Sequence, residues 1–496
     1  ASDPSRCTSY PLDDARATLA VYQAQERHAH YLADQYRQAR AAFALHLQSA
    51  WGLRTDEPGV HVLRTQTQAE LEAVEEDLIL AGLVRPGGTR DTKAAKARMV
   101  EVCRRAGITI PRTDAHFAED DSESKCKAAD GTPLPAEHPD CFEHVGLDGE
   151  ACEASEDDLL VKYAARTTLG KVLSNDITAL EGGTQYPIHT RYGLAATGRS
   201  TSSKPNIQNQ SKRAGIREAF VPRPGRLFAQ ADFPQLELYT LAQCCVTWLG
   251  QSKLAEVLNA GLDPHLAVAS QILGITYDDA KARKATPEVK RARALAKVAN
   301  FGFPGGLGFD SFVDFARASM PRADFDALHL DVTRAKQLKE EWFTAYPEMP
   351  HYFARVNALC ANDANRAFVE TLFTKRWRGA ATYCAACNNG FQALGADCAK
   401  NAGWLIAKAA YVDIASPLFN ARPVAFVHDE FIAEVDDGPR AADAAYELAR
   451  LMVQGANAYL RDVPIPFAKM EPTLMRRWSK NAVQRFDEKG RLVAWE

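Results

Sequence analysis

The sequence lacks any apolar run long enough to cross a membrane. The longest candidate, Trp404 to Leu418, is interrupted by Lys408 and Asp413, whereas a spanning helix needs about 20 predominantly apolar residues. No signal peptide precedes the first charged residues, and no internal repeat is evident. The eleven cysteines are an odd number and do not indicate a disulfide framework. These absences exclude a helical membrane protein, a secreted disulfide scaffold and a repeat array, and they predict a reduced, cytoplasmic protein.

The chain also lacks an overall excess of positive charge. Its net charge of -4 argues weakly against a nucleic-acid partner, but net charge hides the distribution. Lys281 to Lys297 holds seven basic residues against Glu288 alone, and Arg191 to Arg226 holds eight against Glu218 alone. The segment Asp114 to Asp158 is strongly acidic instead. This pattern predicts a groove that binds a polyanion, with a solvated acidic loop elsewhere.

Length and periodicity predict several domains built from helices and a sheet. At 496 residues the chain is long enough for roughly two to four domains. Apolar residues at helical spacing predict helices, and short apolar runs rich in β-forming residues predict strands. The acidic stretch Thr113 to Glu150 has little periodicity and is predicted to be an irregular insertion. Helices are predicted within Asp13–Leu53, Gln68–Leu83, Thr92–Ala106, Leu236–Trp248, Leu254–Leu273, Glu288–Phe301, Trp342–Val369 and Asn388–Tyr411, and strands at Leu227–Phe233 and within Val424–Val435.

Three residues in one predicted helix suit the binding of a nucleoside triphosphate. Arg293, Lys297 and Phe301 are spaced four apart, so a helix places two cations and an aromatic ring on one face. Guanidinium and ammonium groups complement phosphate oxygens, and the ring offers a flat surface to a base or sugar. Taken alone, the spacing is more typical of a solvated amphipathic helix with one buried Phe.

Two distant carboxylates add to this pattern. Asp232 and Asp429 each lie at the edge of an apolar, strand-like run. If the two strands are neighbours, the carboxylates can hold a pair of divalent cations, which is the arrangement used for in-line phosphoryl transfer. Taken singly, an aspartate at a strand end is more often a turn former.

Four segments in the same order resemble the family A DNA polymerases. Ala231 to Leu238 resembles motif A, the Arg293-x3-Lys297-x3-Phe301-Gly302 helix resembles motif B, and Val427 to Glu430 resembles motif C. Thr197 to Asn209 resembles the primer-template segment of the family. The resemblance covers about 300 residues, from Arg191 to the C-terminus. It implies a bacterial DNA polymerase I-like enzyme of a phage-type variant.

The resemblance implies a role for each matching residue. Asp232 and Asp429 would be the catalytic pair that binds two Mg²⁺ ions, which Mn²⁺ can replace, with the backbone carbonyl of Phe233 as a further ligand. Glu237 would be the steric gate against a ribose 2′-hydroxyl. The residues that would contact the dNTP are Arg293, Lys297, Phe301, His265, Gln235 and Glu237, and those that would contact primer-template DNA are Arg199, Asn206, Gln208, Asn209, Asn388, Gln392 and His428.

The chain departs from the family pattern at several positions. Gly305 stands where bacterial members carry a tyrosine whose ring backs the gate, which makes fidelity and sugar selection an open question. Cys384 stands where an arginine is usual, and Pro234 and Tyr239 replace the usual small residue and arginine of motif A.

The first residues resemble the end of a proofreading exonuclease. Tyr10 and Asp14 match a Tyr-x3-Asp motif of the 3′→5′ exonuclease that precedes the polymerase in this family, although the two residues can equally cap a helix. The earlier carboxylates of that nuclease site have no counterpart in the preceding nine residues. We therefore predict synthesis without proofreading, with any exonuclease or processivity factor on a separate chain.

One group of potential metal ligands lies in the acidic insert. It contains His138, Cys141 and His144 at spacings of three, with Cys126 and Cys152 on either side. The insert has no Cys-x2-Cys pair, so the zinc signal is weak and an ordinary loop is the alternative.

Together these features predict an α+β, right-hand polymerase that acts as a monomer in a bacterial or phage-infected cytoplasm. The alternatives are a single-subunit RNA polymerase of the related phage and mitochondrial type, and an inactive polymerase-like DNA-binding subunit. The predicted boundaries are an exonuclease remnant at 1–14, a thumb at 15–180 with the insert at about 113–150, palm at 181–251 and 347–496, and fingers at 252–346.

Overall fold

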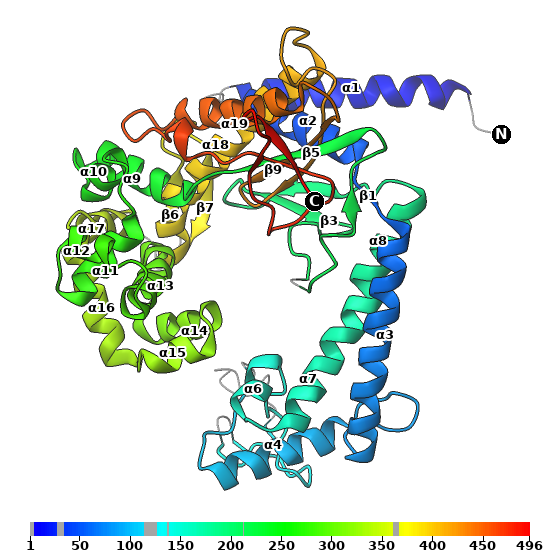
Figure 1. The fold of residues 1–496 in the computed structure, drawn as a ribbon, viewed down its shortest axis with the longest axis vertical. Helices are drawn as coiled ribbons and strands as arrows, with labels where there is room; N and C mark the ends of the chain where they lie inside the picture. The colour runs from blue at the N-terminus through cyan, green and yellow to red at the C-terminus, as the bar shows by residue number, and fades with distance from the viewer. Residues whose placement is uncertain (1–3, 27–33, 114–125, 136–137, 212, 361–366) are drawn as a thin grey trace.

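A six-stranded sheet lies at the centre of the molecule (Figure 1). The computed structural model describes residues 4–26, 34–113, 126–135, 138–211, 213–360 and 367–496. The strand order is β11-β12-β10-β5-β9-β8, and only β10 and β12 pair in parallel. Antiparallel pairing places the middle of the chain beside its C-terminal part. The strands are β5 (Arg226–Asp232), β8 (Arg422–Val427), β9 (Glu430–Asp436), β10 (Thr473–Met475), β11 (Arg485–Phe486) and β12 (Leu492–Trp495).

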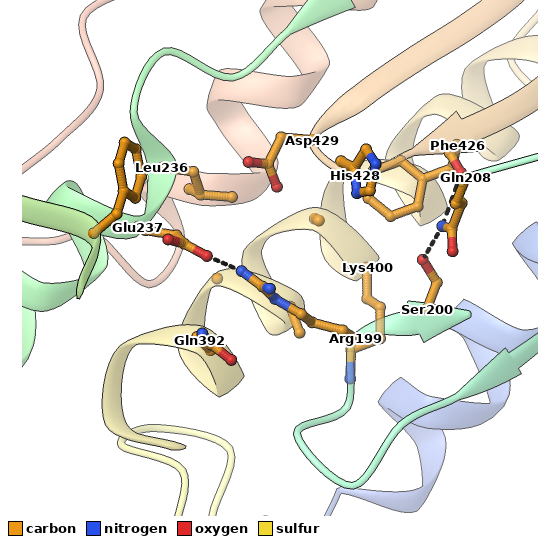
Figure 2. Close-up of a pocket in the computed structure, with 14 residues that line it drawn as sticks. Arg199, Ser200, Gln208, Leu236, Glu237, Gln392, Lys400, Phe426, His428 and Asp429 are labelled. Carbon is orange, nitrogen blue, oxygen red and sulfur yellow. Dashed lines mark hydrogen bonds and ion pairs between the residues drawn. The ribbon is translucent and has the colours of Figure 1, made fainter. Parts of the chain in front are cut away.

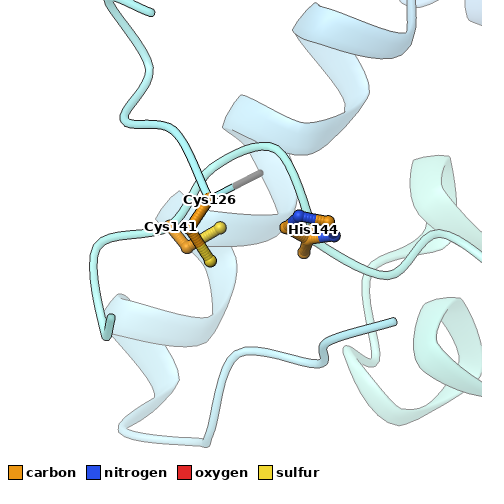
Figure 3. A group of neighbouring side chains, drawn as sticks. All are labelled: Cys126, Cys141 and His144. Atoms are coloured by element: carbon orange, nitrogen blue, oxygen red, sulfur yellow. The ribbon is translucent and has the colours of Figure 1, made fainter. Parts of the chain in front are cut away.

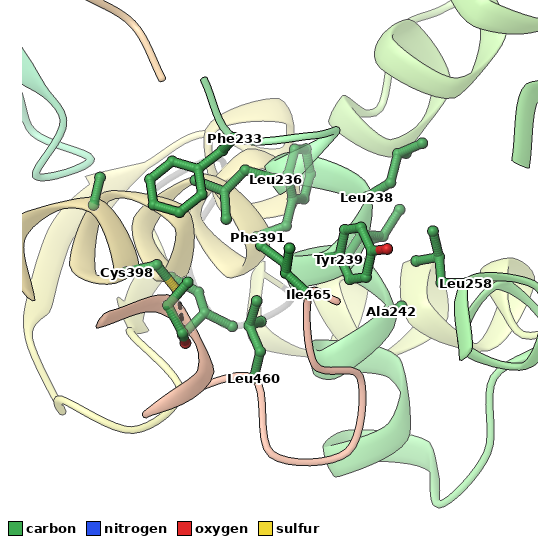
Figure 4. Packing of buried hydrophobic residues seen from close by; sticks show 14 of the residues in the cluster. Phe233, Leu236, Leu238, Tyr239, Ala242, Leu258, Phe391, Cys398, Leu460 and Ile465 are labelled. Atoms are coloured by element: carbon green, nitrogen blue, oxygen red, sulfur yellow. Dashed lines mark hydrogen bonds between the residues drawn. The ribbon is translucent and has the colours of Figure 1, made fainter. Parts of the chain in front are cut away.

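Three long helices beside this sheet contribute to the main hydrophobic core. They are α9 (Leu236–Leu249), α18 (Tyr383–Tyr411) and α19 (Ala441–Asn457). Helices α18 and α19 approach closely because Gly455 has no side chain: a Cβ there would lie 2.5 Å from backbone atoms of Ala402. Figure 4 shows Phe233 and Leu236 in one buried cluster with Phe391 of α18. The segment that follows β5 is therefore anchored by packing before any ligand binds.

A long helical arm extends from the sheet on one side (Figure 1). Its two main helices, α3 (Glu57–Leu80) and α7 (Asp158–Lys171), lie side by side and are joined by ion pairs from Arg166 to Glu75 at 2.8 Å and from Lys162 to Asp77 at 2.6 Å. The tip carries α4 and α6. The remaining elements of the arm are α4 (Thr92–Ala106), α6 (Gly149–Ala154), a π-helical turn (Val172–Ile177) and α8 (Thr178–Gln185).

One helix within the predicted thumb at 15–180 packs with the sheet side of the molecule. Helix α2 (Gln35–Trp51) packs against α18 and β8, and the thumb boundary stays a prediction. The indole N–H of Trp51 donates to the buried Glu434 carboxylate of β9 at 3.1 Å. Sequence periodicity reported the helix but not its partner. The short strands nearby are β1 (Arg54–Thr55), β2 (Arg191–Leu194), β3 (Ser200–Ser203) and β4 (Phe220–Val221).

The first helix carries the residues of the exonuclease resemblance. Tyr10 and Asp14 lie one turn apart on α1 (Pro4–Glu26), and Tyr10 is 73% exposed. Neither observation tests the nuclease assignment, which stays a prediction. Within the described ranges, no helix has both the length and the apolar character needed to span a bilayer.

A cluster of helices opposite the arm forms the third part of the molecule (Figure 1). The single helix predicted over Leu254–Leu273 is wrong, because Asp263 caps a new helix whose first residue is Pro264. The prediction over Trp342–Val369 is also wrong: Pro347 separates two helices, and a strand follows. The elements are α10 (Lys253–Asn259), α11 (Pro264–Leu273), α12 (Tyr277–Ala282), α13 (Pro287–Gly302), α14 (Phe309–Ser319), α15 (Arg322–Ala327), α16 (Val332–Ala345), α17 (Met349–Cys360), β6 (Ala367–Glu370) and β7 (Trp377–Ala381), with 3-10 turns at Phe303–Gly305 and Phe467–Lys469.

Candidate active site

Three carboxylates meet at one end of β5, β8 and β9. Asp232 ends β5 and lies directly opposite Glu430, the first residue of β9. Asp429 lies in the tight turn between β8 and β9, where His428 adopts a left-handed conformation with φ of +57°. The backbone N–H of Phe233 donates to the carbonyl of Asp429 at 3.2 Å. Sheet pairing therefore brings together the two aspartates that the sequence singled out and adds Glu430 beside them.

The shared position of these acids makes their negative charges costly. Loss of hydration, followed by repulsion from Asp429 and Glu430, raises the pKa of Asp232 to about 7. Burial also raises the pKa of Asp429, opposed by the charge of Arg199, and that of Glu430, opposed by a 2.8 Å hydrogen bond from the indole of Trp478. Clustered carboxylate oxygens are the ligands that Mg²⁺ prefers. The donor set therefore fits divalent cations, whose charge would relieve the repulsion.

A cavity of about 280 Å³ joins these acids to the cationic helix. Its lining includes Asp232 and Asp429 together with Arg293, Lys297 and Phe301 of α13. The predicted common face of α13 and the two carboxylates thus border the same cavity. The rest of the lining is Phe233, Gln235, Leu236, Glu237 and His265, so all six residues predicted to contact the dNTP lie around one cavity.

Arg293 already has an ionic partner in this structure. Its Nε donates to Asp263 Oδ2 at 2.8 Å, and Lys284 lies 3.4 Å from the same oxygen. Asp263 also accepts from the backbone N–H groups of His265 and Leu266 at the start of α11. One carboxylate therefore fixes the position of α11 relative to the cationic face of α13.

His265 is held by a hydrogen-bond chain that the sequence did not reveal. The indole N–H of Trp342 donates to Asn300 Oδ1 at 2.8 Å, so the Asn300 amide nitrogen faces His265 Nδ1 at 2.9 Å. Because that nitrogen donates, Nδ1 accepts, and the ring proton resides on Nε2. Burial, reinforced by the charges of Arg293 and Lys297, lowers the pKa of His265 to about 4 despite the opposing charge of Asp263. His265 is therefore a neutral donor at the cavity wall.

An ion pair joins two residues for which the sequence predicted different partners. Figure 2 shows the Arg199 guanidinium bound to the Glu237 carboxylate across a cavity of about 260 Å³. Arg199 was predicted to contact primer-template DNA and Glu237 to act as the sugar gate. The two side chains remain 44% and 20% exposed, so ligands can reach both. No spacing rule could have paired residues so far apart in the chain.

Two amides that are predicted to contact DNA also make hydrogen bonds within the protein. Asn206 Oδ1 accepts from the backbone N–H groups of Gln208 and Asn209, both at 3.1 Å, and from Ser202 Oγ at 2.8 Å. The Gln208 amide donates to Ser200 Oγ at 3.0 Å and to the Phe426 carbonyl at 3.1 Å. These bonds hold the segment after β3 against the end of β8. Asn209 and His428 are exposed.

Asn388 occupies the space next to Gly305. Its amide donates to the carbonyls of Cys384 at 2.9 Å and Gly305 at 3.3 Å, while its oxygen accepts from Gln392 Nε2 at 3.0 Å. A Cβ on Gly305 would lie 2.9 Å from two atoms of the Asn388 amide. The absence of a tyrosine at position 305 thus coincides with a neighbour that leaves no room for one.

Other departures from the expected pattern also have structural partners. Tyr239 is fully buried in α9, and Lys469 Nζ donates to its hydroxyl at 3.2 Å.

Lys480, from the segment after β10, lines a cavity of about 270 Å³ beside Asp232 and Glu430. No motif pointed to this lysine, because its segment matches none of them.

Comparison with known proteins identifies relatives for most of the chain. The family model for DNA polymerase family A matches residues 153–470. DNA polymerase I of Aquifex aeolicus is 25% identical over 68% of this chain and 54% of its own length. The corresponding enzyme of Chloroflexus aurantiacus is 30% identical over 57% of this chain and 28% of its own, and the thermostable one of Thermus filiformis is 30% identical over 65% and 36%. The chain thus spans from about a quarter to about half of these relatives.

A solved structure shares the fold. The POL domain of Pol1 from M. smegmatis, in complex with DNA primer-template and dNTP, superposes with a TM-score of 0.63 at 20% identity, covering 89% of this chain and 70% of that one. This likeness confirms the predicted α+β, right-hand polymerase fold.

Proposed function

Because this chain belongs to DNA polymerase family A, we propose that it is a DNA-directed DNA polymerase. It would extend the 3′-hydroxyl of a primer with dNTPs and release pyrophosphate. One observation carries the proposal: the paired aspartates and the cationic face of α13 line the same cavity of about 280 Å³. This arrangement suits a triphosphate whose α-phosphate lies near the metal ligands.

Asp232, Asp429 and the backbone carbonyl of Phe233 would hold two Mg²⁺ ions, with Glu430 adjacent. When bound, the ions lower the pKa of the attacking hydroxyl and stabilise the charge that develops on the phosphate. The high pKa of Asp232 supports this assignment, since a carboxylate that is costly to ionise alone gains most from a cation.

The chain's own residues would orient the nucleotide. Arg293 and Lys297 would bind the phosphates, and Arg293 would exchange its bond with Asp263 for one with the ligand. The Nε2–H of neutral His265 would donate to a phosphate oxygen. Phe301 would stack near the base and sugar, Gln235 would line the same cavity, and Glu237 would exclude a 2′-hydroxyl.

Primer-template DNA would bind on the Arg199 side of the site. Arg199, Asn209, His428 and Gln392 offer donors there, and minor-groove acceptors are nearly independent of sequence.

We propose that α3 to α8 form the thumb, residues 252–346 the fingers, and the sheet with α2, α9, α18 and α19 the palm. A monomeric state, a cytoplasmic location, the absence of proofreading, and separate exonuclease or processivity factors stay predictions.

Primer extension with a pair of variants tests this proposal. Asp429→Ala should abolish extension of a labelled primer. The affinity of this variant for primer-template should stay within about threefold of the wild type, which is less than about 1 kcal/mol in binding free energy. Asp436→Asn, at the far end of β9, is the matched control and should extend normally. Extension by Asp429→Ala would refute the catalytic assignment. Absence of extension by the wild type, with retained DNA binding, would favour the inactive DNA-binding alternative.

Comparison of nucleotide types tests the second alternative. Wild type should extend the primer with dNTPs and discriminate against rNTPs, and Glu237→Ala should weaken that discrimination by opening space at the sugar. Equal use of both by the wild type would favour an RNA polymerase, which the match to the DNA polymerase family disfavours.

A further inference from the structure

A group of soft metal ligands lies in the segment between α4 and α6, and Figure 1 shows these two helices at the tip of the arm. Cys126, Cys141 and His144 come together there, and their ligand atoms all lie within 4.8 Å of one another (Figure 3). The three residues are only 2%, 1% and 7% exposed. Burial of two thiols and an imidazole around one point is the arrangement that metal binding requires, and the family match assigns no role to this group.

Backbone hydrogen bonds hold the three residues in place. The carbonyl of Lys127, next to Cys126, accepts from the N–H groups of Phe142 at 2.7 Å and Glu143 at 3.2 Å. This links the turn that begins at Cys126 to the turn between Cys141 and His144. The N–H of Cys141 donates to the carbonyl of His138 at 3.0 Å, which fixes the start of the second turn. The cluster is thus built by two cross-linked turns.

The Cys141 thiol lies among hydrogen-bond donors. They are the side chain of Cys126 and the backbone N–H groups of His144 and Lys127. Backbone N–H groups directed at a sulfur stabilise the negative charge that a metal ligand carries. On the other side, Thr113 Oγ1 lies 3.4 Å from His144 Nδ1, so the imidazole has a neighbour that can orient it while Nε2 binds a metal.

We propose that Cys126, Cys141 and His144 bind a structural zinc ion. Tetrahedral zinc with bonds of about 2.3 Å to sulfur and about 2.0 Å to nitrogen places its ligand atoms roughly 3.5–3.8 Å apart, so the observed group needs shifts of only about 1 Å. Thiolate and imidazole ligands exclude Mg²⁺ and Ca²⁺, which require oxygen. The fourth position is left for a water molecule or another side chain.

The other two residues of the sequence pattern do not join this group. Cys152 lies in a separate hydrophobic cluster with Met99 and Leu160, where burial raises its pKa to about 11. His138 Nδ1 accepts from the backbone N–H of Asp140 at 3.2 Å and serves its own turn. The sequence pattern therefore contained the ligands, but it could not separate them from their neighbours.

The tip has a physical need for a cross-link of this kind. Its cluster around α4 and α6 contains six buried apolar residues, and the described part between α4 and α6 contains no helix or strand of its own. Small irregular segments with so little core are commonly stabilised by a metal or a disulfide. A zinc ion would tie the two turns together and, through Val145, to the hydrophobic cluster. This inference does not rest on the proposed polymerase activity.

Metal analysis of the full chain tests the proposal. Protein grown with added zinc and washed with a weak chelator should retain about one zinc ion per chain, as a structural site does. Cys141→Ala and His144→Ala should lose it, whereas the matched controls Cys152→Ala and His138→Ala should keep it. Retention by the first pair, or loss of zinc from the wild type in the wash, would overturn the proposal.

Two further measurements cover variants that fail to fold and the competing use of the thiols. Replacement of zinc by Co²⁺ in the wild type should give the absorption bands of tetrahedral cobalt with thiolate ligands, and octahedral bands alone would contradict the site. Intact-mass analysis after alkylation should find Cys126 and Cys141 as free thiols once the metal is removed. A disulfide between them in freshly purified, zinc-free protein would replace the zinc assignment.

Discussion

Replacement of Asp232 by asparagine should stabilise the metal-free protein while abolishing synthesis. In the absence of cations, Asp232 must ionise opposite Glu430 and near Asp429, and its pKa is raised from an ordinary value near 4 to about 7. The folded state therefore holds this proton more tightly than the unfolded state. As the pH rises from about 4 through 7, the free energy of unfolding falls. Asparagine resembles the protonated carboxyl and removes that loss.

The size of the effect follows from the shift and from the position of Asp232. Three pKa units correspond to about 4 kcal/mol at 1.36 kcal/mol per unit. Asp232 loses part of its hydration but still contacts solvent at the open end of β5. Because water screens the repulsion from Asp429 and Glu430, the expected effect on the free energy of unfolding is about 1–2 kcal/mol. That amount predicts a rise in melting temperature of roughly 1–2 °C for a chain of 496 residues. The gain should be smaller at pH 5.5 than at pH 8.

Scanning calorimetry in a chelating buffer measures this directly. Asp436→Asn, which changes an exposed member of a surface ion pair on the same sheet, is the control and should shift the melting temperature little. Added Mg²⁺ should raise the melting temperature of the wild type and have less effect on Asp232→Asn, because a ligand is missing. Equal or lower stability of the variant at pH 8 in chelator, or a gain that does not depend on pH, would refute the electrostatic reasoning.

Two further predictions concern neighbours of the nucleotide cavity. Gly305→Ala should displace the Asn388 amide and weaken the hydrogen bonds of Asn388, which destabilises the protein by about 1 kcal/mol. The melting temperature should fall, and misincorporation in primer extension should change. An unchanged melting temperature and unchanged misincorporation would show that Asn388 moves freely. Asn300→Ala should leave the buried Trp342 N–H without its acceptor, and calorimetry should show a loss of about 1–3 kcal/mol in the free energy of unfolding. The variant should also raise the KM for dNTP, because it releases His265. A stability loss with an unchanged KM would contradict a role for His265 in binding the nucleotide.

The sequence was sufficient where function depends on local spacing. The Arg293, Lys297 and Phe301 face follows from helical periodicity alone, and in the structure it borders the same cavity as the carboxylates. The ends of β5 and the turn at Asp429 were also predictable, because apolar strands with a polar residue at the edge have a clear pattern. Convergence of the two aspartates needed the family resemblance, since no local rule pairs β5 with β9.

What the sequence could not provide is the set of partners across the fold. Asn300 has no signature that distinguishes it from a surface amide, yet it is buried between Trp342 and His265. Similarly, α2 has ordinary helical spacing, and only its contact with β8 shows that it belongs with the sheet. The amides of Asn206 and Gln208 match the DNA-binding pattern, but that pattern does not show that they also make hydrogen bonds within the protein.

The ion pair between Arg199 and Glu237 has a consequence for the order in which ligands bind. Without ligands, each group is the counter-ion of the other. Under the proposed function, a primer-template that takes Arg199 leaves Glu237 with an uncompensated charge close to Asp232 and Asp429, which increases the local demand for cations. DNA would therefore strengthen the binding of a metal-bound nucleotide, and by thermodynamic reciprocity the nucleotide would strengthen the binding of DNA to the same degree. A single side-chain contact thus couples the two substrates before either reacts.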